Sequence, residues 1–176
     1  HNAKNAEAFG VELDIRKNLD FIGLRGLSLV CNAAYIYSRV RFEDGAPERD
    51  RPLAGQSPYL VNAGLFYQHD DKGISASLLY NRIGKRIESV GVPMQNESED
   101  IPDIYEMPRN SLDLTFSKKI GKFVEIKAGV QDLLNSKVEY KQFVKLTDEN
   151  GGKREREQLI RSYRPPARLF RNRQRM

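Results

Sequence analysis

The sequence predicts an all-β fold, in the form of an antiparallel up-and-down sheet that crosses a membrane. Apolar and polar side chains alternate with a period of two along much of the chain, whereas helical spacing is scarce. Charged residues make up 30% of the 176 residues, and no stretch has the roughly 18 consecutive apolar residues of a membrane helix. A β-barrel needs apolar side chains only at every second position, so the low mean hydropathy of -0.62 is compatible with it.

The alternation predicts six strands and the beginning of a seventh. The strands cover about residues 9–16, 27–38, 59–68, 74–81, 111–117 and 124–131, and the seventh begins near 161–164. The segment DDKG at 70–73 is a turn signal that joins two of these strands in a hairpin, and Gly121 marks a second turn. Each apolar stripe is close to the roughly 9 to 11 residues that a tilted strand needs to cross a bilayer.

Each predicted strand has an apolar face and a face with polar or small side chains. We expect the apolar set to face lipid: Phe9, Val11, Leu13, Ile15, Leu29, Tyr35, Val61, Leu65, Tyr67, Ile74, Leu78, Tyr80, Leu112, Leu114, Phe116, Val124, Ile126 and Val130. We expect the second set to line the lumen: Glu12, Asp14, Arg16, Asn62, Ser77, Asn81, Asp113, Glu125, Lys127 and Gln131. This arrangement is typical of a membrane barrel with lipid outside and water or a plug inside.

The predicted connections alternate strictly between short and long. Short ones lie at about 17–26, 69–73 and 118–122, and long polar ones at about 43–57, 84–107 and 134–160. Outer-membrane barrels have this arrangement, with tight turns at the periplasmic rim and long extracellular loops. In that orientation aromatic residues form two candidate belts at the membrane interfaces, where amphipathic rings are favoured. The outer belt contains Phe9, Tyr35, Tyr37, Tyr59 and Tyr80, and the inner belt contains Tyr67 and Phe116.

Seven strands do not fill a closed barrel of even strand number. Open edges in lipid leave backbone groups unpaired at several kcal/mol each, so we expect residues 1–164 to be the C-terminal portion of a larger outer-membrane barrel. Residues 165–176 are expected to form an atypical basic tail, frameshifted or disordered, because Pro165-Pro166 is poor strand material. Much of the net charge of +5 lies after residue 152, and we expect a solvated tail rather than a nucleic-acid site.

Five segments in the same order resemble the C-terminal barrel region of TonB-dependent outer-membrane receptors. They are RPLAGQSPYLVNAG at 51–64, LYNRIGKR at 79–86, PDIYE at 102–106, Pro108-Arg109 with Ser111-Leu112-Asp113, and DLLN at 132–135. The similarity covers about residues 3–164. No single segment is diagnostic, but the ordered set is quite specific.

The resemblance implies part of an energy-coupled importer in the outer membrane of a Gram-negative bacterium. It implies a barrel of roughly 22 strands closed around a plug. The implied partners are outer-membrane lipid, the plug domain, the remaining barrel strands, and TonB acting through the plug; neither plug nor TonB box is recognised in these residues. The implied substrate is a scarce nutrient: a siderophore, cobalamin, a glycan or a peptide. We expect any substrate contacts to lie around Glu43–Arg51, Arg86–Met107 and Tyr140–Ile160.

The sequence offers little catalytic chemistry. With histidine only at positions 1 and 69 and a single cysteine, Cys31, no zinc-binding set is available. We therefore expect no enzymatic activity, no cofactor and no metal. The acidic residues Glu97, Glu99, Asp100, Asp103 and Glu106 are expected to form a solvated loop rather than a cation site.

The DLLN segment is expected to end a strand, with Asp132 and Asn135 bonding to nearby backbone. Two other interpretations of the whole chain stay open. One is a complete small outer-membrane barrel with a structural or adhesion role, and the other is a soluble β-sheet binding module.

Overall fold

The computed structural model describes residues 3–94, 100–121, 123–147, 152–166 and 168–175, without the side chains at 147, 153 and 170–175. The described residues form β-strands, loops and one short 3-10 helix, η1 (Asp20–Ile22), and they include no α-helix. None of their helical segments is long and apolar enough to cross a membrane.

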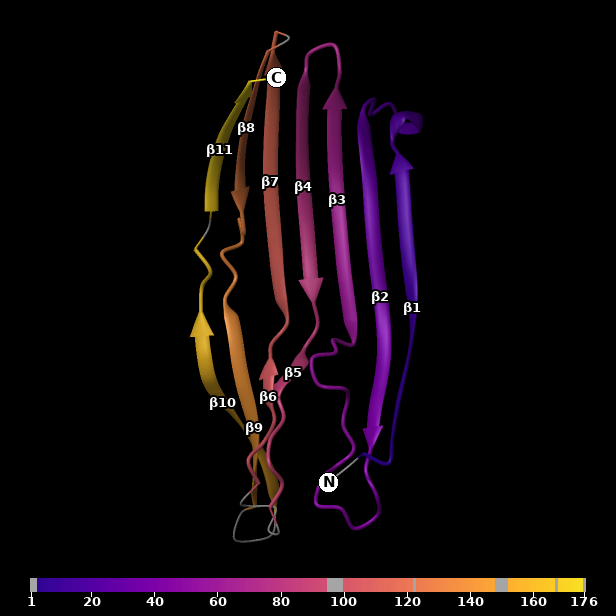
Figure 1. Cartoon of the computed structure of the whole chain (residues 1–176), viewed down its shortest axis with the longest axis vertical. Helices are drawn as coiled ribbons and strands as arrows, with labels where there is room; N and C mark the ends of the chain where they lie inside the picture. The colour runs from indigo at the N-terminus through magenta and orange to yellow at the C-terminus, as the bar shows by residue number, and fades with distance from the viewer. Residues whose placement is uncertain (1–2, 95–99, 122, 148–151, 167, 176) are drawn as a thin grey trace.

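The larger of two sheets is an antiparallel meander of seven strands (Figure 1). Its strands, in order, are β1 (Asn5–Asn18), β2 (Leu27–Arg41), β3 (Tyr59–His69), β4 (Ile74–Ile83), β7 (Arg109–Ile120), β8 (Val124–Gln131) and β11 (Arg168–Arg175). Each is antiparallel to the next. The prediction of an all-β, antiparallel fold is therefore confirmed. β1 and β11 are the two edges, so the sheet is open in the described part of the chain.

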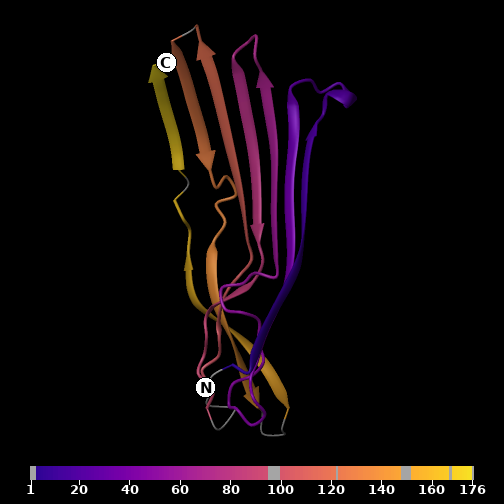
Figure 2. The same ribbon diagram turned by 45° about the vertical axis from the view of Figure 1, so that its right-hand side comes forward.

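The second sheet continues the first toward one end of the molecule (Figures 1 and 2). Its strand order is β10-β9-β6-β5. The bounds are β5 (Arg86–Ser89), β6 (Ile104–Glu106), β9 (Val138–Thr147) and β10 (Lys153–Tyr163). Since β5 and β9 follow β4 and β8, while β6 and β10 precede β7 and β11, the chain passes seven times along the molecule in its described part.

Short and long connections lie at opposite ends of the sheet. η1 and the β3–β4 and β7–β8 turns lie at the upper end of Figure 1, and the long connections lie at the lower end. Gly26, after η1, has a φ of +75°, and a Cβ there would lie 2.2 Å from the Gln68 carbonyl oxygen. Only glycine permits this close pairing of the first turn with β3.

Two of the predicted long loops contain strands. Residues 84–107 include β5 and β6, and residues 134–160 include β9 and much of β10. Ion pairs link the strands of these hairpins. Arg86 Nη2 in β5 lies 2.7 Å from Glu106 Oε2 in β6, and Lys141 Nζ in β9 lies 2.6 Å from Glu157 Oε1 in β10. Because charged side chains occupy strand positions, the apolar alternation that predicts strands elsewhere is lost here.

The chain also continues as a strand where the sequence predicts a tail. Residues 168–175 form β11, which pairs with β8 from Arg168 opposite Gln131 to Arg175 opposite Val124. Pro165 and Pro166 lie in the link between β10 and β11, outside the hydrogen-bonded ladder. They therefore cost no ladder donor.

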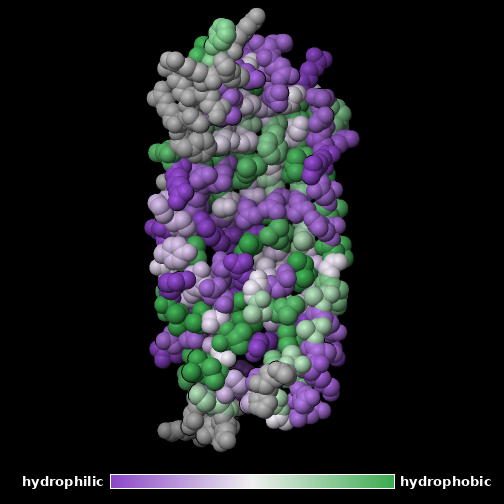
Figure 3. All heavy atoms as spheres, viewed as in Figure 1, coloured by the Kyte–Doolittle hydropathy of each residue, from purple (hydrophilic) through white to green (hydrophobic). Residues whose placement is uncertain are grey.

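Hardly any of the described apolar side chains are buried. The buried ones are Ile87, Val138 and Tyr140, and all three belong to the second sheet. The accessible surface is 12695 Å², compared with about 8,800 Å² for a compact protein of this mass. The larger sheet is thus a single layer, and the face seen in Figure 3 mixes hydrophilic and hydrophobic side chains.

Candidate functional site

One face of the larger sheet carries an apolar surface that runs across its strands. The strand registers place every residue of the predicted lipid-facing set on this face. Its most regular row contains Leu29, Leu65, Leu78, Leu114, Val130 and Leu169, each directly opposite the next on six neighbouring strands. Leu65, Leu114 and Leu169 are 39%, 42% and 82% exposed, so no other part of the described chain covers this row.

The opposite face carries the whole predicted lumen-facing set. One row across five strands contains Asp14, Asn32, Asn62, Asn81 and Ser111. The Asn81 amide donates to the Asn62 side-chain oxygen, and Asn32 Nδ2 donates to Glu12 Oε1 at 2.6 Å. The two predicted sets therefore lie on opposite faces, while the assignment of these faces to lipid and lumen stays a prediction.

The DLLN segment ends β8, as the sequence suggests, but with different partners. Asp132 and Asn135 have φ values of +55° and +46°. The Asp132 carboxylate pairs with Arg109 Nη2 at 2.6 Å, and its backbone N–H donates to Asp113 Oδ1 at 2.8 Å. The predicted bond from the Asp132 side chain to nearby backbone is replaced by an ion pair with the start of β7, the neighbouring strand.

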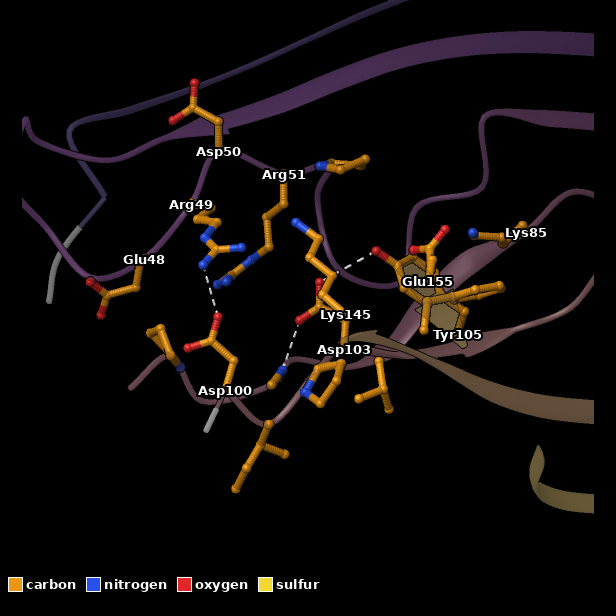
Figure 4. A pocket seen from close by; sticks show the side chains of 17 residues that line it. Glu48, Arg49, Asp50, Arg51, Lys85, Asp100, Asp103, Tyr105, Lys145 and Glu155 are labelled. Carbon is orange, nitrogen blue, oxygen red and sulfur yellow. Dashed lines mark hydrogen bonds and ion pairs between the residues drawn. The ribbon is translucent and has the colours of Figure 1, made fainter. Parts of the chain in front are cut away.

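A pocket of about 370 Å³ lies at the end with the long connections (Figure 4). Parts of all three segments predicted to contact substrate line it, which brings residues far apart in sequence together. They are Glu48, Arg49, Asp50, Arg51, Pro52, Lys85, Gly91, Pro93, Asp100, Ile101, Pro102, Asp103, Tyr105, Phe143, Val144, Lys145 and Glu155.

Asp50 supports the first wall of this pocket. Its carboxylate accepts a hydrogen bond from the Phe42 N–H at 3.3 Å and pairs with Arg39 Nη2 at 2.8 Å. These contacts lower the pKa of Asp50, the Phe42 hydrogen bond being the larger cause and Arg39 the next, although burial opposes them. Asp50 thus fixes the loop after β2.

Asp100 and Asp103 support the second wall in the same way. Asp100 accepts from the Met94 N–H at 2.8 Å and from Arg49 Nη2 at 2.9 Å. Asp103 accepts from the Gly91 N–H at 2.8 Å. The acidic segment is therefore partly tied to its own loop, rather than fully solvated as expected. Glu97 and Glu99 lie outside the described residues.

An aromatic corner forms the third wall. The rings of Tyr105 and Phe143 meet edge to face with centroids 5.7 Å apart, and Lys85 Nζ lies 4.2 Å from each centroid. Burial raises the pKa of the Tyr105 hydroxyl, and the carboxylates of Asp103 and Glu155 raise it further. Lys85 is held on the two rings by cation–π attraction.

Sequence reasoning located the three segments but not the side chains that meet. Lys85 lies just outside the predicted contact segments, although the aromatic residues Tyr105 and Phe143 in two of these segments could have marked the corner. No group of three or more His, Cys, Asp or Glu in the described residues is arranged to hold a metal ion. Cys31 is a free thiol in the apolar face, between Ile15 and Ala63.

Comparisons with known proteins found no match to this chain. The chain matches no protein-family model, no curated protein and no solved structure.

Proposed function

We propose that this chain forms part of the wall and extracellular loops of an outer-membrane β-barrel that imports a scarce nutrient. The observation that carries the proposal is the uncovered apolar row on a single-layer sheet whose other face carries a row of polar side chains across five strands. In water such a row is an aggregation hazard. In a bilayer it meets hydrocarbon, while antiparallel ladders satisfy the backbone within the sheet.

The edges of the sheet support a larger barrel. β1 and β11 are the first and last of seven described antiparallel strands, so both run toward the rim with the short connections. Antiparallel closure between them needs an odd number of further strands. A barrel of roughly 22 strands would supply about 15 of these. Two copies related by rotation about the barrel axis would instead bring β11 of one beside a parallel β1 of the other.

Importer function and coupling to TonB come from the resemblance of the five ordered segments to TonB-dependent receptors. In this proposal the polar face contacts a plug domain, the short connections lie in the periplasm, and the pocket opens to the outside. The chain contributes binding surface and wall rather than catalysis.

Cysteine labelling in intact cells tests the location and orientation. In a Cys31→Ser background, Asp44→Cys places a thiol in a long connection and Asp71→Cys places one in a short turn; both positions are exposed. We expect a membrane-impermeant maleimide to label Asp44→Cys in intact cells and Asp71→Cys only after the outer membrane is permeabilised. Recovery of the protein in the soluble fraction, or equal labelling of both variants in intact cells, would refute the proposal.

A further inference from the structure

The charged side chains around the pocket fall into two groups. Some form bonds within the loops that make its walls, and others are available to contact a ligand. Asp50, Asp100 and Asp103 each accept a hydrogen bond from a loop N–H, and Asp50 and Asp100 also pair with arginines. These carboxylates stabilise the walls. Burial, and then the carboxylates of Asp103 and Glu155, raise the pKa of Tyr105, so Glu155 acts on the aromatic corner.

The cations Arg51 and Lys145 have a different environment. The Arg51 guanidinium carbon lies 5.1 Å from the Phe42 ring centroid, and the guanidinium group carries five N–H donors. Figure 4 shows the Arg51 and Lys145 side chains extending into the pocket from opposite walls. Neither has a hydrogen bond or ion pair to a side chain in the described part of the protein, in contrast to Arg49, which pairs with Asp100.

We propose that this pocket binds a small organic oxyanion, with a carboxylate or phosphate group between Arg51 and Lys145. Guanidinium and ammonium groups are the side chains that recognise such oxygens, arginine through two parallel hydrogen bonds. This inference deepens the proposed function, on which it rests, by naming the chemical class that the outward-facing pocket accepts.

The remaining walls define the rest of the ligand. Pro52, Pro102 and Val144 contribute apolar side chains to the lining, and Tyr105 and Phe143 contribute aromatic rings. A volume of about 370 Å³ lies at the lower end of the range for small-molecule sites. The pocket therefore fits an acid with a compact apolar or aromatic body, rather than a free inorganic ion.

Three probes that share one ring and differ in charge test the proposal. Benzoate, benzamide and benzylammonium are titrated into the purified full chain in detergent, and binding is followed by ligand-detected NMR. We expect benzoate to bind most tightly and benzylammonium least. Arg51→Gln and Lys145→Gln should each raise the Kd for benzoate about tenfold, as expected for loss of a charged hydrogen bond.

Matched variants separate site binding from general attraction to a basic protein. Arg25→Gln removes one exposed positive charge at the opposite rim and should leave the Kd unchanged. Arg51→Lys should restore part of the affinity lost in Arg51→Gln, and circular dichroism of each variant reports its fold. Equal binding of the three probes, or folded Arg51→Gln and Lys145→Gln variants with unchanged benzoate affinity, would overturn the proposal. Binding in detergent does not depend on membrane location, so failure here and failure of the labelling test are distinguishable.

Discussion

The two sheets of this protein differ in whether their apolar side chains are buried. The four-stranded sheet holds the buried apolar side chains of the described residues, Ile87, Val138 and Tyr140, and it borders the pocket. The seven-stranded sheet is larger but has neither a buried apolar side chain among its described residues nor a layer packed against either face. The four-stranded sheet has a small core of its own, whereas no other described part of the chain covers the apolar face of the seven-stranded sheet.

This contrast shows that a regular alternation of apolar side chains along a strand and the burial of those side chains within the same chain are separate properties. The leucine row around Leu114 is regular because the antiparallel register places every second position of neighbouring strands on the same face. The second sheet lacks this regularity because its charged side chains form individual ion pairs. Lys141 Nζ, for example, lies 3.4 Å from Glu139 Oε2 and 2.6 Å from Glu157 Oε1. Substitutions in the two regions should therefore respond differently to the surrounding medium.

The largest effect is expected in the small core. Ile87 is 1% exposed, so Ile87→Ala leaves a cavity and should lower the free energy of unfolding by about 4 kcal/mol. Ile120→Ala, at a position 53% exposed, is the control and should cost less than about 1 kcal/mol. Urea titration in detergent measures both. Similar losses for the two variants would remove the distinction between the core and the open sheet.

The apolar face should respond to charge in a bilayer. Leu114→Arg places a cation in the middle of the leucine row and should lower the stability of the inserted protein by about 3 kcal/mol. Asp113→Asn, on the opposite face, keeps an oxygen for the Asp132 N–H and should cost much less. The folded fraction in vesicles, measured by heat-modifiability gels, compares them. Equal tolerance of both changes would show that the two faces are assigned wrongly.

The junction between the sheets contains a partly buried ion pair. Asp132 follows β8, is 7% exposed, and pairs with Arg109 at 2.6 Å. Asp132→Asn tolerates the positive φ but removes the charge, and should cost about 2 kcal/mol of stability by urea titration. Asn135→Gly, at the other positive-φ residue, should change stability by less than about 0.5 kcal/mol. A larger loss in Asn135→Gly would indicate that backbone conformation, rather than charge, holds this junction.

The sequence predicts six of the seven strands of the larger sheet, all except β11, because their apolar alternation does not depend on which strands lie beside them. Phe9, Val11, Leu13 and Ile15 alternate with polar residues in β1, and a uniform medium on each face is sufficient to explain that order. In β9 and β10 the same period carries lysine, arginine and glutamate. Ion-pair partners of these charged residues lie on neighbouring strands, as Glu157 does for Lys141. The sequence of β9 and β10 therefore resembles that of a polar loop when the strand register is not known.

The pocket is predictable only to the level of its segments. Length and polarity indicated the three long connections, but the bonds that shape them join residues distant in sequence, such as Arg49 with Asp100. The Asp132–Arg109 pair shows the same limit, because its partners become neighbours only through the pairing of β7 with β8. Local sequence identifies a strand end there, whereas tertiary structure selects the partner.

The smallest expected effect is a pH dependence of the stability of the second sheet. Hydrogen bonding to Glu157, and next to Glu139, raises the pKa of Lys141, although burial opposes the change. A raised folded-state pKa means that the stabilisation is complete below the unfolded value of about 10.4 and is lost as pH rises through the folded value. Lys141→Met should therefore be less stable than wild type at pH 7, by less than about 1 kcal/mol, with the difference vanishing in alkali. Lys137→Met, whose exposed lysine precedes β9, is the control and should show no such pH-dependent difference in urea titrations. A difference that persists unchanged at high pH would mean that Lys141 stabilises the second sheet through its aliphatic stem rather than through its charge.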